Sequence, residues 1–388
     1  EAAGGITWKD VARFLKEGVT GSFQITPELE RRYREAVTGA ASPAAKLDAI
    51  VRYLLKEIDG ENETSWQDPT QALMTRQGNR IPVAMAFLEL AGIPHRLLIA
   101  EAVPDKAYRE ALARLGQFRF PVLQVDLPGS RPRYFTLSSP YRNPDILPWY
   151  LQGASALPVT DPEPWREAAI PRDFSPWAEA EESDQRELLE NGDLRLEHSG
   201  VLDPEAEESL RSTFHKMASD QWKRVIQMSL AKRYGNVDLL DYGLEGLEDA
   251  GRRLDWTYSI VIKGFAGEDG GRLTVPDPLP ALQLGQAYAS LKERKLPLST
   301  GGPIFISQAI SLKIPEGYAL DFPLADTDLK TEFGRYRLAS RREGNGVRIA
   351  RRLEMPYQLV WPQPYPKFAQ FLRAIDRAES VQMVASKP

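Results

Sequence analysis

The sequence contains no cysteine. This absence excludes thiol catalysis, disulfide bonds, thiolate metal sites and iron–sulfur clusters. It also fits an oxidising compartment, where free thiols are a liability. Histidine is scarce, with three residues in 388, namely His95, His198 and His215. His95 begins an apolar segment and is expected to be structural, and the other two have no second histidine or carboxylate at ligand spacing. The pattern therefore predicts no metal site and no cofactor.

A surplus of positive charge and a long apolar run are also missing. The net charge is −5 and the pI about 5.6, which argues against nucleic acid or an anionic membrane as the main partner. No membrane span, signal peptide or phosphate-binding glycine loop is visible, so direct membrane insertion is not expected. With 42% hydrophobic and 27% charged residues, the composition is that of an ordinary globular protein with two or three domains.

Residues 1–160 predict one α+β domain. Ser42 followed by Pro43 is a strong helix start, and Thr26 is a plausible cap for another helix. The expected elements are helices over 8–16, 27–37, 43–58 and 82–91, followed by strands over 95–102, 121–127 and 133–139. The last two strands are expected to pair as an antiparallel hairpin.

The rest of the chain predicts a linker and a second domain. Residues 161–187 are rich in proline and acids and read as a linker pinned by aromatic residues, with the acids from Glu179 to Asp184 solvated. Residues 188–388 predict a β-sandwich interrupted by one long helix, which starts at Asp203-Pro204 and ends at Tyr234.

The most informative segment is the turn Gly78-Asn79-Arg80. A loop ends at Gly78-Asn79, and a helix of small and apolar residues then runs to Ala91. A thiol at such a capped helix start would have a lowered pKa, because the helix dipole and free N–H groups favour the thiolate. Here Arg80 occupies that position, and a guanidinium cannot attack a carbonyl carbon.

These residues resemble the transglutaminase-like (papain-like) domain of large bacterial envelope proteins, which is flanked there by β-sandwich domains of unknown function. The family pattern is Arg-x-Gly-Asp-Cys, and this chain has Arg-Gln-Gly-Asn-Arg over 76–80, then Ala-Gly-Ile over 91–93. The resemblance implies that Arg80 stands at the nucleophile and Phe120 at the histidine. The aspartate falls in the run 134–138, where Thr136 and Ser138 are the polar residues.

A Cys-His-Asp mechanism needs a nucleophile, a base and a group that orients the base. All three positions are replaced here, so the resemblance implies a degenerate domain that is not an enzyme. The candidate groove is formed by Asn79, Arg80, Phe120, Thr136 and Ser138. Arg80 has two readings: it forms a local salt bridge and fills the nucleophile pocket, or it presents its guanidinium to a ligand carboxylate.

We therefore expect a non-catalytic scaffold or protein-binding module of the bacterial cell envelope or periplasm, with a protein or peptide partner. The alternatives are a hydrolase that uses Ser138 or Ser139, and a carbohydrate-binding module that uses aromatic residues such as Trp149 and Tyr150. The sequence does not indicate an oligomeric state.

Overall fold

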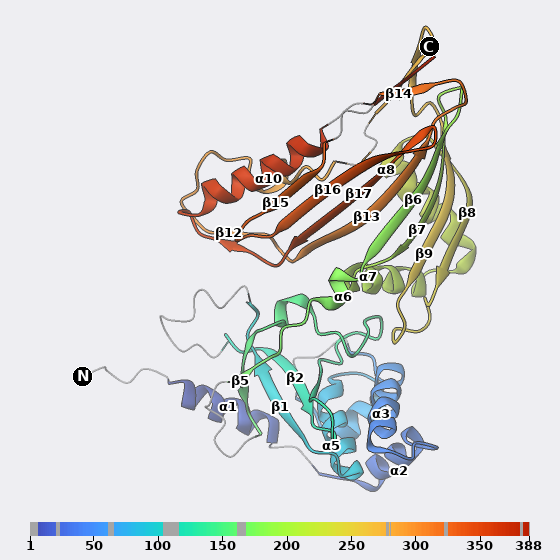
Figure 1. Cartoon of the computed structure of the whole chain (residues 1–388). Coiled ribbons are helices and arrows are strands. Elements are labelled where there is room, and N and C mark those ends of the chain that lie inside the picture. The colour runs from blue at the N-terminus through green and yellow to red at the C-terminus, as the bar shows by residue number, and fades with distance from the viewer. Residues whose placement is uncertain are drawn as a thin grey trace. The chain divides into compact units, whose positions relative to one another are not determined.

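The computed structural model describes residues 7–20, 24–60, 66–103, 116–160, 168–276, 279, 281–321, 325–380 and 383–387. The chain forms two compact units, Glu1–Phe174 and Ser175–Pro388 (Figure 1).

The first unit begins with helices that start at the expected capping residues. The side chains of Thr26 and Ser42 accept hydrogen bonds from the N–H groups of Leu29 and Ala45. The helices are α1 (Trp8–Thr20), α2 (Pro27–Ala36), α3 (Pro43–Glu57), α4 (Pro69–Thr75) and α5 (Arg80–Ala91).

An antiparallel sheet follows these helices. Its strands are β1 (His95–Ala100), β2 (Phe120–Val125), β3 (Arg133–Phe135), β4 (Ser155–Pro158) and β5 (Ala168–Ala169), in the order β3-β2-β1-β4-β5. The expected hairpin is confirmed, because β2 and β3 pair antiparallel with Leu123 opposite Phe135. The 3-10 helix η2 (Trp149–Leu151) precedes β4.

Both faces of this sheet are buried, each in a different cluster. One face packs against the helices through Leu97, Ile99 and Leu123. The opposite face carries Leu98, Ala100 and Val122, which the segment around Leu147, Leu151 and Ile170 covers. Because neighbouring residues of a strand point to opposite faces, a shift of one residue moves a side chain from one cluster to the other.

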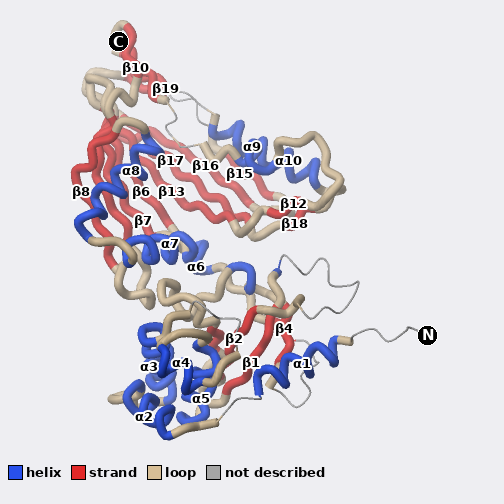
Figure 2. Tube along the Cα trace, turned by 180° about the vertical axis from the view of Figure 1, so that it is seen from behind, coloured by secondary structure: helices blue, strands red, loops and turns tan. Residues whose placement is uncertain are grey.

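The second unit is built on one large sheet (Figures 1 and 2). Its strand order is β15-β16-β17-β13-β6-β7-β9-β8, with β13 and β6 parallel and the other neighbours antiparallel. The strands are β6 (Glu181–Leu188), β7 (Leu194–Val201), β8 (Val237–Glu245), β9 (Asp255–Ile262), β13 (Ile304–Lys313), β15 (Thr327–Lys330), β16 (Arg335–Glu343) and β17 (Gly346–Met355).

Helices and smaller sheets complete the core of the second unit. The helices are α6 (Ser175–Ala178), α7 (Pro204–His215), η3 (Ser219–Gln221), α8 (Trp222–Tyr234), α9 (Leu284–Tyr288) and α10 (Tyr365–Glu379). A four-stranded sheet has the order β10 (Gly267–Asp269), β11 (Arg272–Val275), β19 (Met383–Ser386) and β14 (Ala319–Asp321), and β12 (Leu298–Ser299) pairs with β18 (Leu359–Val360).

The α+β class is confirmed, but the expected linker is wrong over its C-terminal part. Residues 181–187 belong to β6, which lies between β13 and β7 in the middle of the large sheet. Trp177 is buried and donates its indole N–H to Glu205, so this aromatic residue is pinned as expected. Residues 161–167, including Trp165, lie outside the described residues.

The expected long helix is divided in two. Helix α7 ends at His215, η3 follows, and α8 begins at Trp222. Trp222 fixes this corner, because its indole N–H donates to the Met217 carbonyl and its ring contacts Phe214 edge to face. The second layer of the unit thus consists of α7, α8 and α10 together with the small sheet. Within the described ranges, no helix is both long and apolar enough to cross a membrane.

A buried charged network lies on the inner face of the large sheet. Asp184 of β6 accepts from His198 Nδ1 at 2.8 Å and from Arg186 at 2.5 Å. The His198 ring stacks on Tyr258, with 4.4 Å between ring centroids. Burial raises the pKa of Asp184, but the His198 hydrogen bond and the Arg186 charge outweigh it, so the net pKa is lowered. Asp184, expected to be solvated, is 1% exposed.

The pKa direction predicts how Asp184 contributes to stability. A lowered folded-state pKa stabilises the fold above the ordinary pKa, and this contribution is lost as the pH falls through the folded-state pKa. Asp184→Asn should therefore lower the free energy of unfolding at neutral pH by about 3–5 kcal/mol, the scale for breaking a buried ion pair. In urea titrations, the gap to wild type should narrow below about pH 4.

The matched control is Glu187→Gln, at an exposed position of the same strand. This substitution should change the free energy of unfolding by less than about 1 kcal/mol. A gap between Asp184→Asn and wild type that stays constant down to pH 3 would contradict the assignment.

Candidate functional site

The turn before α5 is held by backbone and amide hydrogen bonds. Asp59 N–H donates to the Arg76 carbonyl, and Gly78 N–H donates to the Asp59 carbonyl, both at 2.8 Å. Gly78 has φ +118°, and a Cβ there would clash with the Gln67 side chain. Gln67 in turn donates to the Gln77 carbonyl at 2.6 Å. The geometry therefore requires glycine at position 78.

Asn79 caps α5, as the sequence predicts. Its Oδ1 atom accepts from Ile81 N–H at 3.0 Å, and the residue is 1% exposed. The helix then begins at Arg80 and ends at Ala91, with Gly92 in the left-handed conformation after it. Position 80 is therefore the first residue of a capped helix, where the family resemblance places a nucleophile.

Arg80 is 3% exposed and its guanidinium points into the first unit. Nε donates to the Ile58 carbonyl at 2.9 Å, and one terminal nitrogen donates to the carbonyls of Leu137 and Ser138 at 2.8 and 3.2 Å. A Cβ at Gly60 would clash with the same nitrogen. Arg80 is thus buried and held locally, with backbone carbonyls among its acceptors where the first reading expects a salt bridge.

The loop after β3 provides two of those carbonyls. Leu137 has φ +54°, a left-handed conformation that is unusual for a branched, bulky residue. The Thr136 and Ser138 hydroxyls are 3.1 Å apart and bond to each other. The structure therefore brings together Asn79, Arg80, Thr136 and Ser138, although Ser138 meets Arg80 through its backbone.

Phe120 does not belong to this group. Its side chain packs in the cluster on the opposite face of the sheet, against Tyr150 with ring centroids 5.0 Å apart. Pro121 instead pairs with Ile99, which faces the helices. Phe120 therefore does not line the candidate groove with Arg80, whereas Pro121 lies on the face of the sheet that packs against the helices.

His95 and His198 each lie in a structural setting. His95 Nδ1 contacts the Ile93 carbonyl at 3.0 Å, and His95 pairs with Val125, at the end of β2 away from Phe120. Strand β3 runs antiparallel to β2, with Leu123 opposite Phe135. The loop after β3, which holds Ser138, therefore lies toward the Phe120 end of β2. His198 has a carboxylate partner, Asp184, which the sequence spacing did not reveal. In the described part of the chain, no three His, Cys, Asp or Glu residues are grouped to hold a metal ion.

The aromatic residues proposed for sugar binding are packed against each other. Trp149 and Tyr150 are half-buried, with an edge-to-face contact of 5.9 Å between centroids, and Tyr150 also contacts Phe120. Tyr150 packs against the sheet face away from the helices. The arrangement of the rings is that of a packed layer.

Comparisons with known proteins support the fold. A solved structure described as a "putative protease" from Parabacteroides distasonis is similar to this chain, with a TM-score of 0.53 and 11% identity. The similarity covers 97% of this chain but 58% of that one, so this chain spans less than two thirds of its neighbour. At this identity the likeness shows the fold alone.

Residues 274–385 match the family profile DUF3858, a domain of unknown function with a solved structure. This match covers less than a third of the chain. No curated protein matches the sequence. Neither finding names a transglutaminase-like family, so that resemblance remains an expectation.

The buried geometry of Arg80 predicts the effect of charge reversal. Arg80→Glu would place a carboxylate against the carbonyls of Ile58, Leu137 and Ser138, which would outweigh the favourable helix dipole. We expect the free energy of unfolding to fall by about 3–5 kcal/mol. Because Arg80 is 3% exposed, it does not present its guanidinium at the surface, as the second reading requires.

The control is Arg76→Glu on the same turn, because the Arg76 side chain is 67% exposed and its pairing with Glu57 is at the surface. Its effect should stay within about 1 kcal/mol. If both reversals cost the same in chemical denaturation, the buried hydrogen bonds of Arg80 do not stabilise the fold.

Proposed function

We propose that this chain is a non-catalytic module of a bacterial cell-envelope protein, in which a transglutaminase-like (papain-like) first unit serves as a scaffold or protein-binding platform. The observation that carries the proposal is the position of Arg80. Its guanidinium occupies the start of α5, buried and bonded to three backbone carbonyls. A guanidinium is not a nucleophile, and moving it out of this buried position would break its hydrogen bonds to the three carbonyls.

The described residues nearest to Arg80 also argue against an acyl-transfer site. A general base must lie within hydrogen-bond reach of the nucleophile. The residue that faces the helices at the start of β2 is Pro121, which has no side-chain acceptor. The hydroxyls of Thr136 and Ser138 bond to each other. In the described part of the first unit, His95 lies at the opposite end of β2 from the loop that holds Ser138, which counts against the Ser-based alternative.

The cell-envelope location rests on two supports. One is the resemblance of the Gly78-Asn79 turn and its helix to envelope domains, and the other is the absence of cysteine. A protein or peptide partner follows from the same resemblance. Fractionation of cells that express the full-length protein tests this location. Recovery of the protein in the cytosolic fraction would contradict the proposed location.

The purified chain should show no transamidation, amidase or peptidase turnover above a buffer blank. The physical reason is that Arg80 and Pro121, which stand at the proposed positions of nucleophile and base, can serve in neither role. Turnover is measured with a glutamine peptide and a fluorescent amine, and by ammonia release. Turnover that Ser138→Ala or Ser139→Ala abolishes would favour the Ser-based hydrolase instead.

A unique thiol at position 80 tests the proposed equivalence more sharply. The chain has no other cysteine, so alkylation of Arg80→Cys reports one group. Adding Pro121→His should lower the thiol pKa by roughly one unit or more, because an imidazolium beside a thiol stabilises the thiolate. The iodoacetamide rate as a function of pH measures this pKa.

The matched control is Arg80→Cys with Phe120→His, which places the imidazole on the opposite face of β2. This variant should alkylate like Arg80→Cys alone. Equal thiol pKa values in the Pro121→His and Phe120→His variants would show that position 80 does not face the start of β2. Thermal melts of all three variants establish that they are folded.

A further inference from the structure

The large sheet of the second unit has an edge at β15. Among the described residues, this strand ends the strand order and has β16 as its hydrogen-bonded neighbour. Thr331 N–H donates to the Gly334 carbonyl at 2.9 Å and closes the β15–β16 hairpin. In an antiparallel ladder the residues that bond to one neighbour alternate with those that face the other side. The N–H and C=O groups of Asp328 and Lys330 therefore point away from β16.

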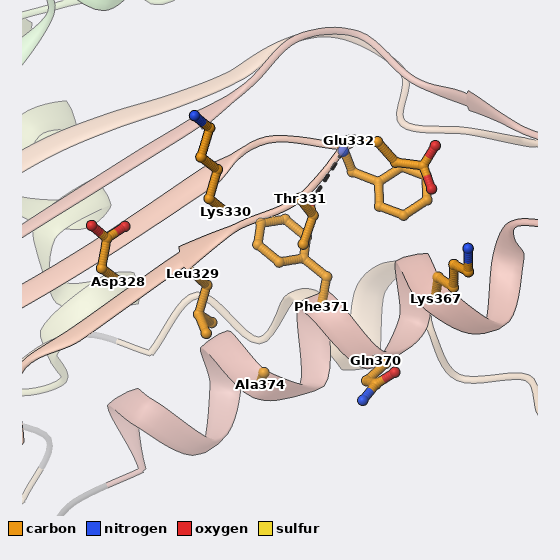
Figure 3. Close-up of a pocket in the computed structure, with 10 residues that line it drawn as sticks. Asp328, Leu329, Lys330, Thr331, Glu332, Lys367, Gln370, Phe371 and Ala374 are labelled. Carbon is orange, nitrogen blue, oxygen red and sulfur yellow. Dashed lines mark hydrogen bonds between the residues drawn. The ribbon is translucent and has the colours of Figure 1, made fainter.

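A groove runs between this edge and α10 (Figure 3). Its volume is about 570 Å³, and residues 328–333 form one wall. Lys367, Gln370, Phe371 and Ala374 of α10 form the other wall. Leu329 points toward Ala374, whereas Asp328 and Lys330 point away from the helix (Figure 3). An added strand would thus meet backbone groups at the edge and apolar side chains below it.

The charges on β15 of one copy are complementary to those on β15 of a second copy when the two strands pair in one symmetric register. In an antiparallel pairing of two β15 strands centred on Leu329, Asp328 of each copy lies opposite Lys330 of the other. Both residues direct their backbone groups outward, so the hydrogen bonds and the opposite charges coincide. Centring the pair on Asp328 or Lys330 would instead place like charges opposite each other.

The setting of Lys330 within one copy favours the same partner. Lys330 lies opposite Arg335 of β16, a like-charge pair that is unfavourable on a sheet. The Arg335 guanidinium bonds to both oxygens of Asp328, at 3.0 and 2.6 Å. A carboxylate from a second copy would place an opposite charge directly across the new strand pair from Lys330. At the flanks Asp326 would meet Glu332, which limits the pairing to the central residues.

We propose that a second copy of this chain docks edge to edge through β15, in the register centred on Leu329, and that the two large sheets become continuous. Leu329 of each copy lies on the two-fold axis, where the pair adds to the apolar floor of both grooves. Such an interface is isologous, since the same surface serves both copies. The paired strand is four residues long, so the interface is small and the dimer is weak and concentration-dependent. This inference does not depend on the proposed absence of catalysis.

Sedimentation velocity of the full chain over a concentration series tests the proposal. The wild type should shift from monomer to dimer as concentration rises. Asp328→Lys and Lys330→Asp each place like charges opposite each other twice per dimer and should weaken association by roughly tenfold or more. The double variant Asp328→Lys/Lys330→Asp restores opposite charges across the axis, so its dimerisation should return toward the wild-type level.

Lys330→Pro gives a second test that does not depend on charge. The Lys330 N–H faces outward, so proline removes no hydrogen bond to β16 but blocks pairing at the edge. This variant should melt like the wild type and remain monomeric. Asp241→Lys, an exposed charge reversal on the opposite edge strand β8, should leave dimerisation unchanged.

A wild type that remains monomeric over its whole soluble range overturns the proposal. So does a dimer that survives both Lys330→Pro and Asp328→Lys, because the copies then meet elsewhere. If the edge instead binds an added peptide strand while the chain stays monomeric, the occupant is a foreign chain and the self-association proposal is wrong.

Discussion

The first unit depends on the burial of the Arg80 guanidinium. A cation at the start of a helix opposes the helix dipole, and its removal from water is costly. Charge-assisted hydrogen bonds to the carbonyls of Ile58, Leu137 and Ser138 offset this cost. These bonds join the end of α3, the start of α5 and the loop after β3, which are far apart in sequence. The left-handed conformation of Leu137 aims its carbonyl at Arg80, so the loop geometry and the arginine support each other.

The parts of the fold that the sequence predicts are those with local signals. Thr26 and Ser42 each cap a helix through their own side chain, and the hairpin strands alternate as expected. Strand β6 was missed because its inward residues include Asp184 and Arg186, so the period-2 pattern of a half-buried strand is hidden by charge. The corner between α7 and α8 was missed for a related reason. No glycine or proline marks it, and the contact of Trp222 with Phe214 that fixes it is tertiary.

The candidate site was predictable in position but not in partners. The order of turn, cap and apolar helix places Arg80 at the start of α5, and the structure agrees. Its acceptors could not be read from the sequence, because every residue carries a carbonyl and only the fold selects Ile58, Leu137 and Ser138. Phe120 lies on the face of the sheet away from Arg80, because neighbouring residues of β2 point to opposite faces. The pairing of His198 with Asp184 has the same origin as the Arg80 contacts, because strand register alone sets these residues opposite each other.

The second unit also contains a buried charged residue, Glu379, whose hydrogen bonds hold α10 against the strands next to the sheet edge. Glu379 near the end of α10 accepts from the Tyr336 hydroxyl of β16 at 2.9 Å and from Arg351 of β17 at 3.0 Å. At the other end of the helix, Phe368 packs edge to face on Phe333, in the turn that follows β15. These contacts fix the distance between α10 and the β15–β16 hairpin. Asp328 and Lys330 take no part in these contacts, although Asp328 is bonded to Arg335 on the neighbouring strand of the same hairpin. The edge can therefore gain or lose a partner without repacking of the core beneath it.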